Sequence, residues 1–259
     1  MDRAAFSPKG GVATGLVVLG LLALWEAAVR VSGIAPILLP SPVDVALELA
    51  ASPSFFLREA AYTTLSTVTG FVLAVLLGVA LAVAIVCSRV LDRIIWTVLV
   101  ILNSLPKVAL APLFVIWMGL GVAPKIAVAV LLALFSIVVD TVLGLRSVDP
   151  DVLALSRISR AGWLREMVLI RLPGALPALF AGMKVAISFA LVGAIVGEFV
   201  GGSSGLGTVI LVAQGQFDTT RVFAALVLLG VLGTLLFHAV EMLERIAIPW
   251  HVSHRVAAD

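Results

Sequence analysis

Two ionisable residues lie inside apolar stretches of this sequence, where a charge is costly. Lys107 follows Asn103, Ser104 and Pro106 in one stretch, and Glu198 lies near the end of another. A charge at the centre of a lipid bilayer costs roughly 3 kcal/mol, so both residues should face protein or an aqueous route, or pair with each other. The proline should kink its helix and free backbone carbonyls that need partners. The alternative is that Lys107 snorkels to the bilayer surface and Glu198 lies at the outer interface.

A glycine-rich segment, residues 201–207, follows Glu198. Its Gly202 and Ser203 are two further candidates for lining the aqueous route. It lacks the lysine and the strand-to-helix context of a phosphate-binding loop, so it is not predicted to bind a nucleotide. His251 and His254 are spaced for one helix face, but two histidines without further ligands do not predict a metal site. We therefore predict no metal, no cofactor and no catalytic residue.

The composition indicates a membrane protein. Of the 259 residues, 62% are hydrophobic and 12% are charged, and the mean hydropathy is +1.21. The surface of a soluble domain needs about twice that charge. The net charge of +2 is too weak and too scattered to predict nucleic-acid binding. We expect the whole chain, residues 1–259, to form one membrane domain.

Six apolar stretches are long enough to cross a bilayer as helices, because a span needs ~20 mostly apolar residues. They cover residues 12–29, 62–86, 94–117, 126–145, 176–199 and 222–243. The predicted fold class is therefore all-α. Between the first two stretches, Ser41, Pro42 and Asp44 form a helix-start signal, with Ser41 as the N-cap. This signal predicts a short surface helix over residues 43–51.

Small residues recur at every fourth position in two of these spans. The second span has Gly70, Ala74, Gly78 and Ala82, and the fifth has Gly182, Ala186, Ala190 and Ala194. Such stripes let another helix approach closely. Continuing the fifth-span stripe by four residues reaches Glu198, so this carboxylate should face protein or an aqueous route. The alternative is that both stripes only pack the bundle.

The distribution of Lys and Arg predicts that both termini are cytoplasmic, because basic residues favour cytoplasmic segments. The basic residues then on the cytoplasmic side are Arg3, Lys9, Arg89, Arg93, Arg146, Arg157, Arg160, Arg165, Arg171, Arg245 and Arg255. Those on the outer side are Arg30, Arg58, Lys125 and Arg221. Lys184 is in the cytoplasmic half of its span and is expected to snorkel.

The cytoplasmic loop, residues 146–173, is predicted to form a helix outside the membrane. Asp149–Asp151 supplies acidic residues and a proline at the helix start, and apolar and basic residues follow at helical spacing. Pro173 and Pro177 should break the chain before the fifth span. Such a helix can dock onto a protein partner. A basic amphipathic helix lying on anionic lipid is the alternative.

Four segments together resemble the permease subunits of binding-protein-dependent ABC importers, within the nitrate, sulfonate and taurine group. They are Trp25-Glu26 with Leu39–Pro42, the run Leu105–Gly121, the loop Arg146–Pro177 and the run Gly197–Gly207. The resemblance covers nearly the whole chain, and the order and spacing of the segments make a chance match unexpected. No nucleotide-binding loop is present in the sequence.

The loop resembles the EAA region of that family, with departures. Its lead-in Arg146–Pro150 and its exit Leu172–Pro177 match the family pattern. Ala154, Leu155 and Ser156 stand where the family has Glu-Ala-Ala, and Arg160 stands where it has a glycine. In the family this helix couples to the nucleotide-binding subunit. The resemblance thus implies contacts with that subunit from Asp151, Leu153, Ala154, Leu155, Arg157, Arg160, Ala161, Gly162 and Trp163.

The resemblance also implies a type I importer fold, a bacterial inner-membrane location, and no enzymatic activity in this chain. The implied partners are an ATPase subunit, an extracytoplasmic solute-binding protein, a second copy of the permease and membrane lipid. A small anion such as an alkylsulfonate, taurine or nitrate is the expected solute, although related permeases carry pyrimidine- or riboflavin-type molecules.

Two other function classes fit the residues less well. In an ion-coupled secondary transporter or channel, Lys107, Asp140 and Glu198 would couple ions or protons to movement of a solute. The two halves of the sequence show no convincing inverted repeat, and a secondary transporter would have no role for the basic loop of residues 146–173. A membrane-embedded enzyme would need a convergent set of catalytic or metal-binding residues, which the spans lack.

Overall fold

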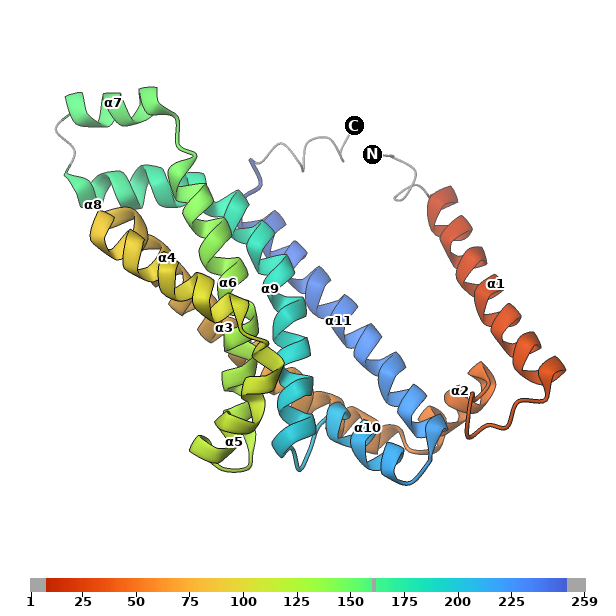
Figure 1. The fold of residues 1–259 in the computed structure, drawn as a ribbon. Helices are drawn as coiled ribbons and strands as arrows, with labels where there is room; N and C mark the ends of the chain where they lie inside the picture. Colours follow the sequence, from red (N-terminus) through yellow and green to blue (C-terminus); the bar gives the residue numbers. More distant parts are fainter. Residues whose placement is uncertain (1–7, 160–161, 251–259) are drawn as a thin grey trace.

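The computed structural model describes residues 8–159 and 162–250, and every regular element within those ranges is a helix (Figure 1). The membrane-spanning helices are α1 (Pro8–Ser32), α3 (Pro53–Cys87), α6 (Val122–Arg146), α9 (Leu172–Gly201) and α11 (Thr219–Ala247). Shorter helices are α2 (Pro42–Ala51), α4 (Arg89–Ser104), the 3-10 turn Lys107–Leu110, α5 (Ala111–Met118), α7 (Pro150–Ile158), α8 (Trp163–Glu166), the π-helix Met167–Arg171 and α10 (Leu206–Gly215).

The structure agrees with the prediction of six spans. Five helices are long and apolar enough to cross a membrane, and a bent pair, Arg89–Ser104 with Lys107–Met118, makes up to six. The helices extend past the predicted apolar stretches. The second span, for example, was predicted over residues 62–86 and is a 35-residue helix.

The short helix α2 begins where its sequence signal predicts. The Ser41 hydroxyl accepts a hydrogen bond from the Asp44 backbone N–H at 3.2 Å. The Asp44 carboxylate in turn accepts one from the Ser41 backbone N–H, also at 3.2 Å. With Pro42 in the first turn, this capping box satisfies donors that no helical carbonyl can reach.

The bundle is built on α6, which packs between α3 and α9. The predicted small-residue stripes make this packing possible. A methyl group added at Gly70 would lie 2.5 Å from Ala129 Cβ, and one added at Gly182 would lie 2.8 Å from Asp140 Cβ, both on α6. Backbones this close require glycine, so both stripes face α6. Phe71, Ala133, Ile137, Phe180 and Ile187 lie in the apolar core between the three helices.

The third span is broken rather than kinked. α4 ends at Ser104, and the helical pair Lys107–Met118 continues at 90° to it. Pro106 has no backbone N–H and disfavours a helical conformation at Leu105, which is extended with φ −77° and ψ 142°. The predicted interruption is therefore confirmed, and it is larger than the predicted kink.

Pro173 and Pro177 do not break the chain, which corrects the prediction. An unbroken helical path runs from Trp163 to Gly201 through the π-helix Met167–Arg171. Pro173 directly follows the π-helix, and its missing N–H removes one hydrogen bond without ending the path. Pro177 removes one hydrogen bond inside α9 without ending it.

The predicted cytoplasmic helix is two helices, α7 and α8, instead of one. α7 ends at Ile158 and α8 begins at Trp163, with Gly162 in an extended conformation before it. Glycine is a poor helix former, which favours a boundary at this point. Trp163 thus belongs to α8, whereas Asp151, Leu153, Ala154 and Leu155 belong to α7.

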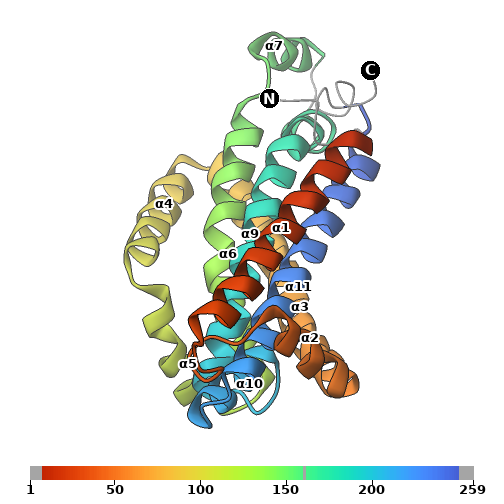
Figure 2. The same ribbon diagram turned by 90° about the vertical axis from the view of Figure 1, so that its right-hand side faces the viewer.

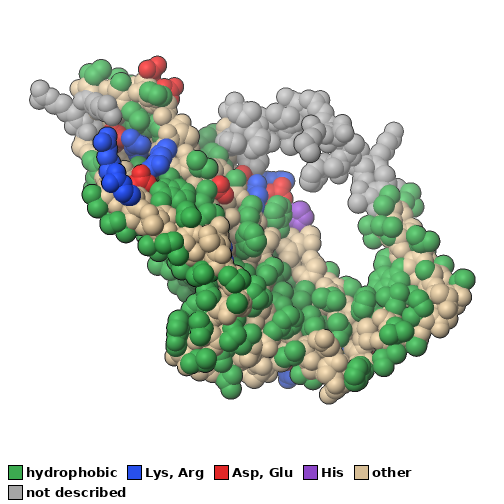
Figure 3. Space-filling view, viewed as in Figure 1, with side chains coloured by type: hydrophobic (Ala, Val, Ile, Leu, Met, Phe, Trp, Pro, Cys, Tyr) green, Lys and Arg blue, Asp and Glu red, His purple; other side chains and the backbone are tan. Residues whose placement is uncertain are grey.

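The start of α1, the end of α11 and α7 lie at one end of the molecule, and α2, α5 and α10 lie at the other (Figures 1 and 2). α1 stands apart from the bundle, and only 6% of its apolar stretch Gly15–Ser32 is buried. Its contacts with the rest include the Trp25 ring, 5.7 Å from the Phe223 ring, and the Glu26 carboxylate, which accepts the Val43 backbone N–H at 3.3 Å. Apolar side chains cover the sides, and most charges in view lie toward the α7 end (Figure 3).

Candidate functional site

Glu198 is fully buried at the end of the α9 stripe, as its position on the stripe predicts. The carboxylate is covered by protein and not by lipid or solvent. Its Oε1 accepts a hydrogen bond from the Thr63 hydroxyl at 2.9 Å, and its Oε2 accepts one from the Gly207 backbone N–H at 2.7 Å. Each carboxylate oxygen thus has a donor, which a buried carboxylate requires.

A second carboxylate, Glu59, holds the same segment from α3. Its Oε2 accepts a hydrogen bond from the Gly205 backbone N–H at 2.7 Å, and its Oε1 accepts one from Arg58 Nε at 3.2 Å. The Thr63 hydroxyl, one helical turn further along α3, accepts the Leu206 backbone N–H at 2.8 Å. Three successive N–H groups before and in the first turn of α10 therefore bind side chains of α3 and α9.

Lys125 supplies a buried positive charge beside these carboxylates. It lies in the first turn of α6 and is 1% exposed. Its Nζ donates a hydrogen bond to the Ser204 carbonyl oxygen at 2.6 Å and lies 3.4 Å from the Ser204 hydroxyl. Sequence reasoning placed Lys125 in an outer segment as a marker of sidedness, and the structure places it inside the bundle.

Glycines allow the segment 202–207 to close over Glu198. Gly205 has φ +107°, a conformation that L side chains rarely adopt, and a methyl group there would overlap the Glu198 carboxylate. A methyl group at Gly207 would lie 2.8 Å from Glu198 Oε2, and one at Gly202 would lie 2.5 Å from the Glu198 carbonyl oxygen. The glycine-rich sequence is therefore explained by close approach to a carboxylate.

We call Glu59, Thr63, Lys125, Glu198 and the segment 202–207 the polar cluster. It ties α3, α6 and α9 to the start of α10 at the end of the molecule opposite α7 (Figure 1). Removing one member would leave a buried group without its partner, which is costly in an apolar interior. The arrangement therefore fixes the segment after α9, and its groups are hydrogen-bonded to one another instead of being poised for catalysis.

Sequence reasoning missed Glu59, Thr63 and Lys125. One signal was available on α3, because Glu59, Thr63 and Thr67 continue the Gly70 stripe backward at helical steps, and all three are buried. Nothing comparable marked Lys125. Its neighbour across the helix interface is Gly197, where a methyl group would lie 2.6 Å from Lys125 Cα.

Lys107 does not pair with Glu198. Its Nζ bonds to Asn103 Oδ1 at 2.6 Å, across the break between α4 and the following turn, and lies 5.6 Å from the centre of the Phe135 ring. Asn103, Ser104 and Pro106 are exposed, and Lys107 is half-buried. The predicted path residues therefore form two groups: Asn103–Lys107 at the break, and Glu198 with Gly202 in the polar cluster.

Lys184 forms an ion pair with the largely buried Glu244 of α11. A carboxylate on the neighbouring helix therefore neutralises the ammonium, and the expected snorkelling stays a prediction. Asp140 of α6 lies against Gly182, where a methyl group would be 2.8 Å from Asp140 Cβ.

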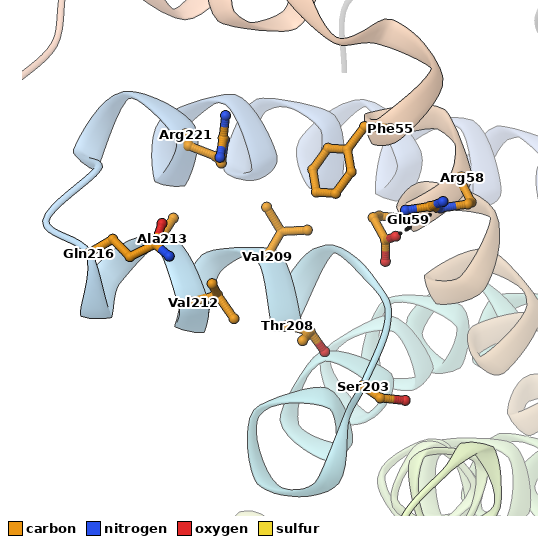
Figure 4. Close-up of a pocket in the computed structure, with 10 residues that line it drawn as sticks. All are labelled: Phe55, Arg58, Glu59, Ser203, Thr208, Val209, Val212, Ala213, Gln216 and Arg221. Atoms are coloured by element: carbon orange, nitrogen blue, oxygen red, sulfur yellow. Dashed lines mark hydrogen bonds and ion pairs between the residues drawn. The ribbon is translucent and has the colours of Figure 1, made fainter.

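A cavity of about 280 Å³ opens beside the polar cluster, between the starts of α3 and α11 and the length of α10 (Figure 4). Glu59 and Ser203 line it, so the cavity and the cluster share a wall. Its other lining residues are Phe55, Arg58, Thr208, Val209, Val212, Ala213, Gln216 and Arg221.

The α7 end presents apolar side chains to the surroundings. Leu155 is 64% exposed and Ile158 is 79% exposed, whereas Leu153 is half-buried. Asp151, Ala154, Gly162 and Trp163 are also exposed. The predictions for Arg160 and Ala161, and for the His251 and His254 pair, concern residues outside those that the structure describes. The same holds for the side chain of Arg157.

Ion pairs attach this end to the bundle. Arg146 at the end of α6 binds Asp92 of α4 at 2.8 Å. Arg171 of the π-helix binds Glu166 of α8 at 2.8 Å and donates to the Leu145 carbonyl oxygen at 3.1 Å. A displacement of α8 would therefore be passed directly to α9 and to the end of α6.

Comparison with known proteins identifies the family. Residues 70–247 match the sequence model described as "Binding-protein-dependent transport system inner membrane component". The riboflavin transport system permease protein RibX of Chloroflexus aurantiacus is 37% identical over 90% of this chain and 88% of its own length. The formylaminopyrimidine transport permease protein ThiX of Halalkalibacterium halodurans is 34% identical over 91% of this chain and 94% of its own length.

A sulfonate permease and a solved structure add to this. The putative aliphatic sulfonates transport permease protein SsuC of Escherichia coli is 31% identical over 95% of this chain and 94% of its own length. An inward-facing structure of the MetNI methionine ABC transporter has a chain that superposes with a TM-score of 0.60 at 23% identity, over 75% of this chain and 94% of that one. This likeness concerns the fold.

These matches confirm the predicted family, the all-helical importer fold and the inner-membrane location. They exclude the secondary transporter and the membrane-embedded enzyme. Members of this family are the membrane subunits of transporters in which a separate ATPase subunit hydrolyses ATP. They also agree with the nitrate, sulfonate and taurine group. The chain belongs to the inner membrane components of binding-protein-dependent transport systems, the permease subunits of ABC importers.

Proposed function

We propose that two copies of this chain enclose the translocation path of an importer for a small anion such as an alkylsulfonate, taurine or nitrate. The observation that carries this proposal is the break in the third span. There Asn103, Ser104 and Lys107 bring polar groups and a positive charge to a partly exposed surface within a membrane-spanning segment. A lysine at that depth attracts an anion, and its cost in lipid is avoided if the surface faces a second copy across an aqueous route.

In this proposal α7 lies on the cytoplasmic side, and the polar cluster lies on the outer side. The basic residues support this orientation, as does the common end shared by α7, the start of α1 and the end of α11 (Figure 2). The cluster then fixes the segment 202–207 at the outer end of α9, where Gly202 and Ser203 border the route. Glu198 acts there by holding this segment and makes no direct contact with solute.

Coupling to the ATPase subunit is assigned to α7, the start of α8 and the link between them. Leu155 is the strongest candidate for the apolar contact, because it is highly exposed on a helix outside the apolar spans. Asp151, Leu153, Ala154, Gly162, Trp163, Arg157, Arg160 and Ala161 complete the assigned surface. Arg157 and Arg160 would replace the polar contacts of the acidic residue and glycine that the family pattern has and this chain lacks.

The coupling assignment is tested by purifying the tagged chain from mild detergent and identifying co-purifying subunits by mass spectrometry. We expect an ATPase subunit with the wild-type chain, and at least a tenfold loss of it with Leu155→Asp, because a carboxylate cannot be buried in an apolar contact. Val90→Asp is the control, since it puts the same charge at another exposed apolar position, in the first turn of α4 and outside the assigned surface. Equal recovery of the ATPase with Leu155→Asp and with Val90→Asp would refute the assignment.

The solute class has a specific competitor. The riboflavin and formylaminopyrimidine permeases are more similar to this chain than the sulfonate permease, at 37% and 34% against 31% identity. A heterocyclic solute is therefore the second candidate. Uptake into proteoliposomes holding the complete importer separates the two. Competition by taurine, an alkylsulfonate or nitrate supports the anion, and competition only by riboflavin or formylaminopyrimidine replaces it with the heterocycle.

A further inference from the structure

The cavity beside the polar cluster has exposed positive charge at its mouth. Arg58 pairs with Glu59, and Arg221 pairs with Glu48, but the arginines are the more exposed partners. The Arg58 side chain is 63% exposed against 9% for Glu59, and the Arg221 side chain is 37% exposed against 22% for Glu48. A molecule approaching this end of the protein therefore meets guanidinium groups before it meets carboxylates.

Both guanidinium groups have donors to spare. The hydrogen bond of Arg58 to the described residues uses its Nε, at 3.2 Å from Glu59 Oε1. Arg221 directs its Nε and one terminal nitrogen to the same oxygen of Glu48, each at 2.8 Å, and its Nε lies 3.7 Å from Asp218. A guanidinium carries five N–H donors in a planar fork, so each arginine can also bind a second carboxylate.

The cavity is small. At about 280 Å³ it falls just below the ~300–1,000 Å³ of pockets that hold whole small-molecule ligands. Ser203 and Glu59 line it, and Thr208 of α10 and Gln216 at the end of α10 add polar groups (Figure 4). This size suits one or two side chains of a protein partner that covers the mouth.

We propose that this cavity is a docking socket for acidic side chains of the solute-binding protein, with Arg58 and Arg221, at its two ends, as their charged contacts (Figure 4). The proposal rests on the proposed function, which puts this end of the molecule on the outer side. A binding protein is the partner that family membership supplies on that side. Complementary charge at such a contact mainly sets the rate and affinity of docking.

Docking at this socket would be communicated to the path through Glu59. An acidic side chain that draws Arg58 away leaves Glu59 bound through its other oxygen to the Gly205 N–H. Glu59 then loses the contact that fixes its Oε1, so its side chain can shift and carry the bound segment 202–207 with it at the outer end of α9. The helical path from Gly201 back to Trp163 spans 39 residues, roughly 58 Å at 1.5 Å per residue, and ends at the surface assigned to ATPase coupling.

The test uses the complete importer in nanodiscs, with the solute-binding protein identified beforehand by cross-linking to the wild-type chain in cells. ATPase activity is titrated with the liganded binding protein. We expect Arg58→Glu and Arg221→Glu each to raise its half-saturating concentration at least tenfold. Arg221→Glu should leave the maximal stimulated rate within about twofold, because Arg221 pairs with Glu48 and not with Glu59. Arg58→Gln should act in the same direction with a smaller effect. Added salt should weaken docking of the wild-type complex more than that of either variant.

Two further variants sharpen the test. Arg30→Glu is the matched control, because Arg30 is an exposed arginine paired with a glutamate on α1 at the same end of the molecule, and it does not line the cavity. We expect it to change the half-saturating concentration by less than twofold. Glu59→Gln should lower that concentration about threefold, because glutamine still accepts the Gly205 N–H but no longer competes for Arg58.

The outcomes separate the two proposals. Wild-type half-saturating concentrations for Arg58→Glu and Arg221→Glu would overturn the socket and leave the proposed function intact. A wild-type chain that recruits no ATPase subunit would overturn the proposed function itself. The arginine variants could instead lower ATPase activity equally with and without binding protein, by an amount that follows the anionic lipid content of the nanodisc. That result would assign the cavity to a lipid headgroup and also overturn the socket.

Discussion

The Thr63 hydroxyl donates to Glu198 Oε1 at 2.9 Å and accepts the Leu206 backbone N–H at 2.8 Å, so one side chain of α3 joins the end of α9 to the start of α10. Thr63 and Glu198 are 135 positions apart in the chain, and both are fully buried. A hydroxyl that both donates and accepts has a defined rotamer, which fixes the direction of the carboxylate. The segment between α9 and α10 is therefore held by side chains from outside it.

Glu198→Ala should destabilise the protein more than Glu198→Gln. Alanine leaves the buried Gly207 N–H unpaired, at about 1–3 kcal/mol, and leaves the Thr63 hydroxyl with only the Glu59 carbonyl oxygen, 3.4 Å away, as an acceptor. Glutamine is similar in shape and can accept one of these hydrogen bonds. The thermal midpoint of the purified complex in detergent measures the difference. Equal midpoints for the two variants would show that Glu198 acts through its charge alone.

Lys125→Met should be strongly destabilising, by about 3–5 kcal/mol, because it leaves Glu59 and Glu198 buried without the nearby ammonium. Adding Glu198→Gln to Lys125→Met should recover part of that loss, because one buried negative charge is then removed as well. A double-mutant cycle on the thermal midpoints checks this. Strict additivity would mean that the ammonium serves only the Ser204 carbonyl, to which it bonds at 2.6 Å.

Gly205→Ala should abolish assembly or reduce ATP-dependent uptake at least tenfold. Its φ of +107° is strained for alanine, and the new methyl group would overlap the Glu198 carboxylate. Gly230→Ala is the control, because Gly230 lies inside α11 with no neighbour within 4 Å of an added methyl group. Alanine there should stabilise the helix by roughly 1 kcal/mol. Wild-type uptake by Gly205→Ala would refute the tight closure of this segment.

Asn103→Cys should react with a membrane-impermeant thiol reagent, whereas Leu76→Cys should not. Both positions are exposed in the single chain, but Leu76 is an apolar residue on α3 and Asn103 lies beside the break in the third span. Thiols react as thiolates, which form in water and not in lipid. The native Cys87 is exposed and is first replaced by serine. Labelling of Asn103→Cys no faster than that of Leu76→Cys would remove this surface from the path.

The sequence predicts those elements whose signals are local. The Ser41 capping box, the small-residue stripes and the interruption at Pro106 each depend on residues a few positions apart, and the structure contains all three. The burial of Glu198 also follows from sequence, because helical periodicity extends the α9 stripe to it.

The polar cluster could be predicted only in part, because it is assembled from residues distant in the chain. From the sequence, Lys125 is expected in an outer segment. Its burial depends on the close packing of α6 against α9 at Gly197, where a methyl group would lie 2.6 Å from Lys125 Cα. The continuity through Pro173 was also unpredictable, since it depends on a π-helix register that no local composition marks. The pairing of Lys184 with Glu244 needs the packing of α9 against α11, which periodicity alone does not give.

The isolation of α1 has a consequence for biosynthesis. Only 6% of the apolar stretch Gly15–Ser32 is buried by the rest of its own chain, so its transfer from the translocon into lipid must be favourable before any second copy is present. It can therefore be inserted and oriented before α3 to α11 have been synthesised. The bundle, whose buried ions Lys125, Glu198 and Glu244 would each be costly in lipid alone, must instead assemble cooperatively around helices that shield one another's charges.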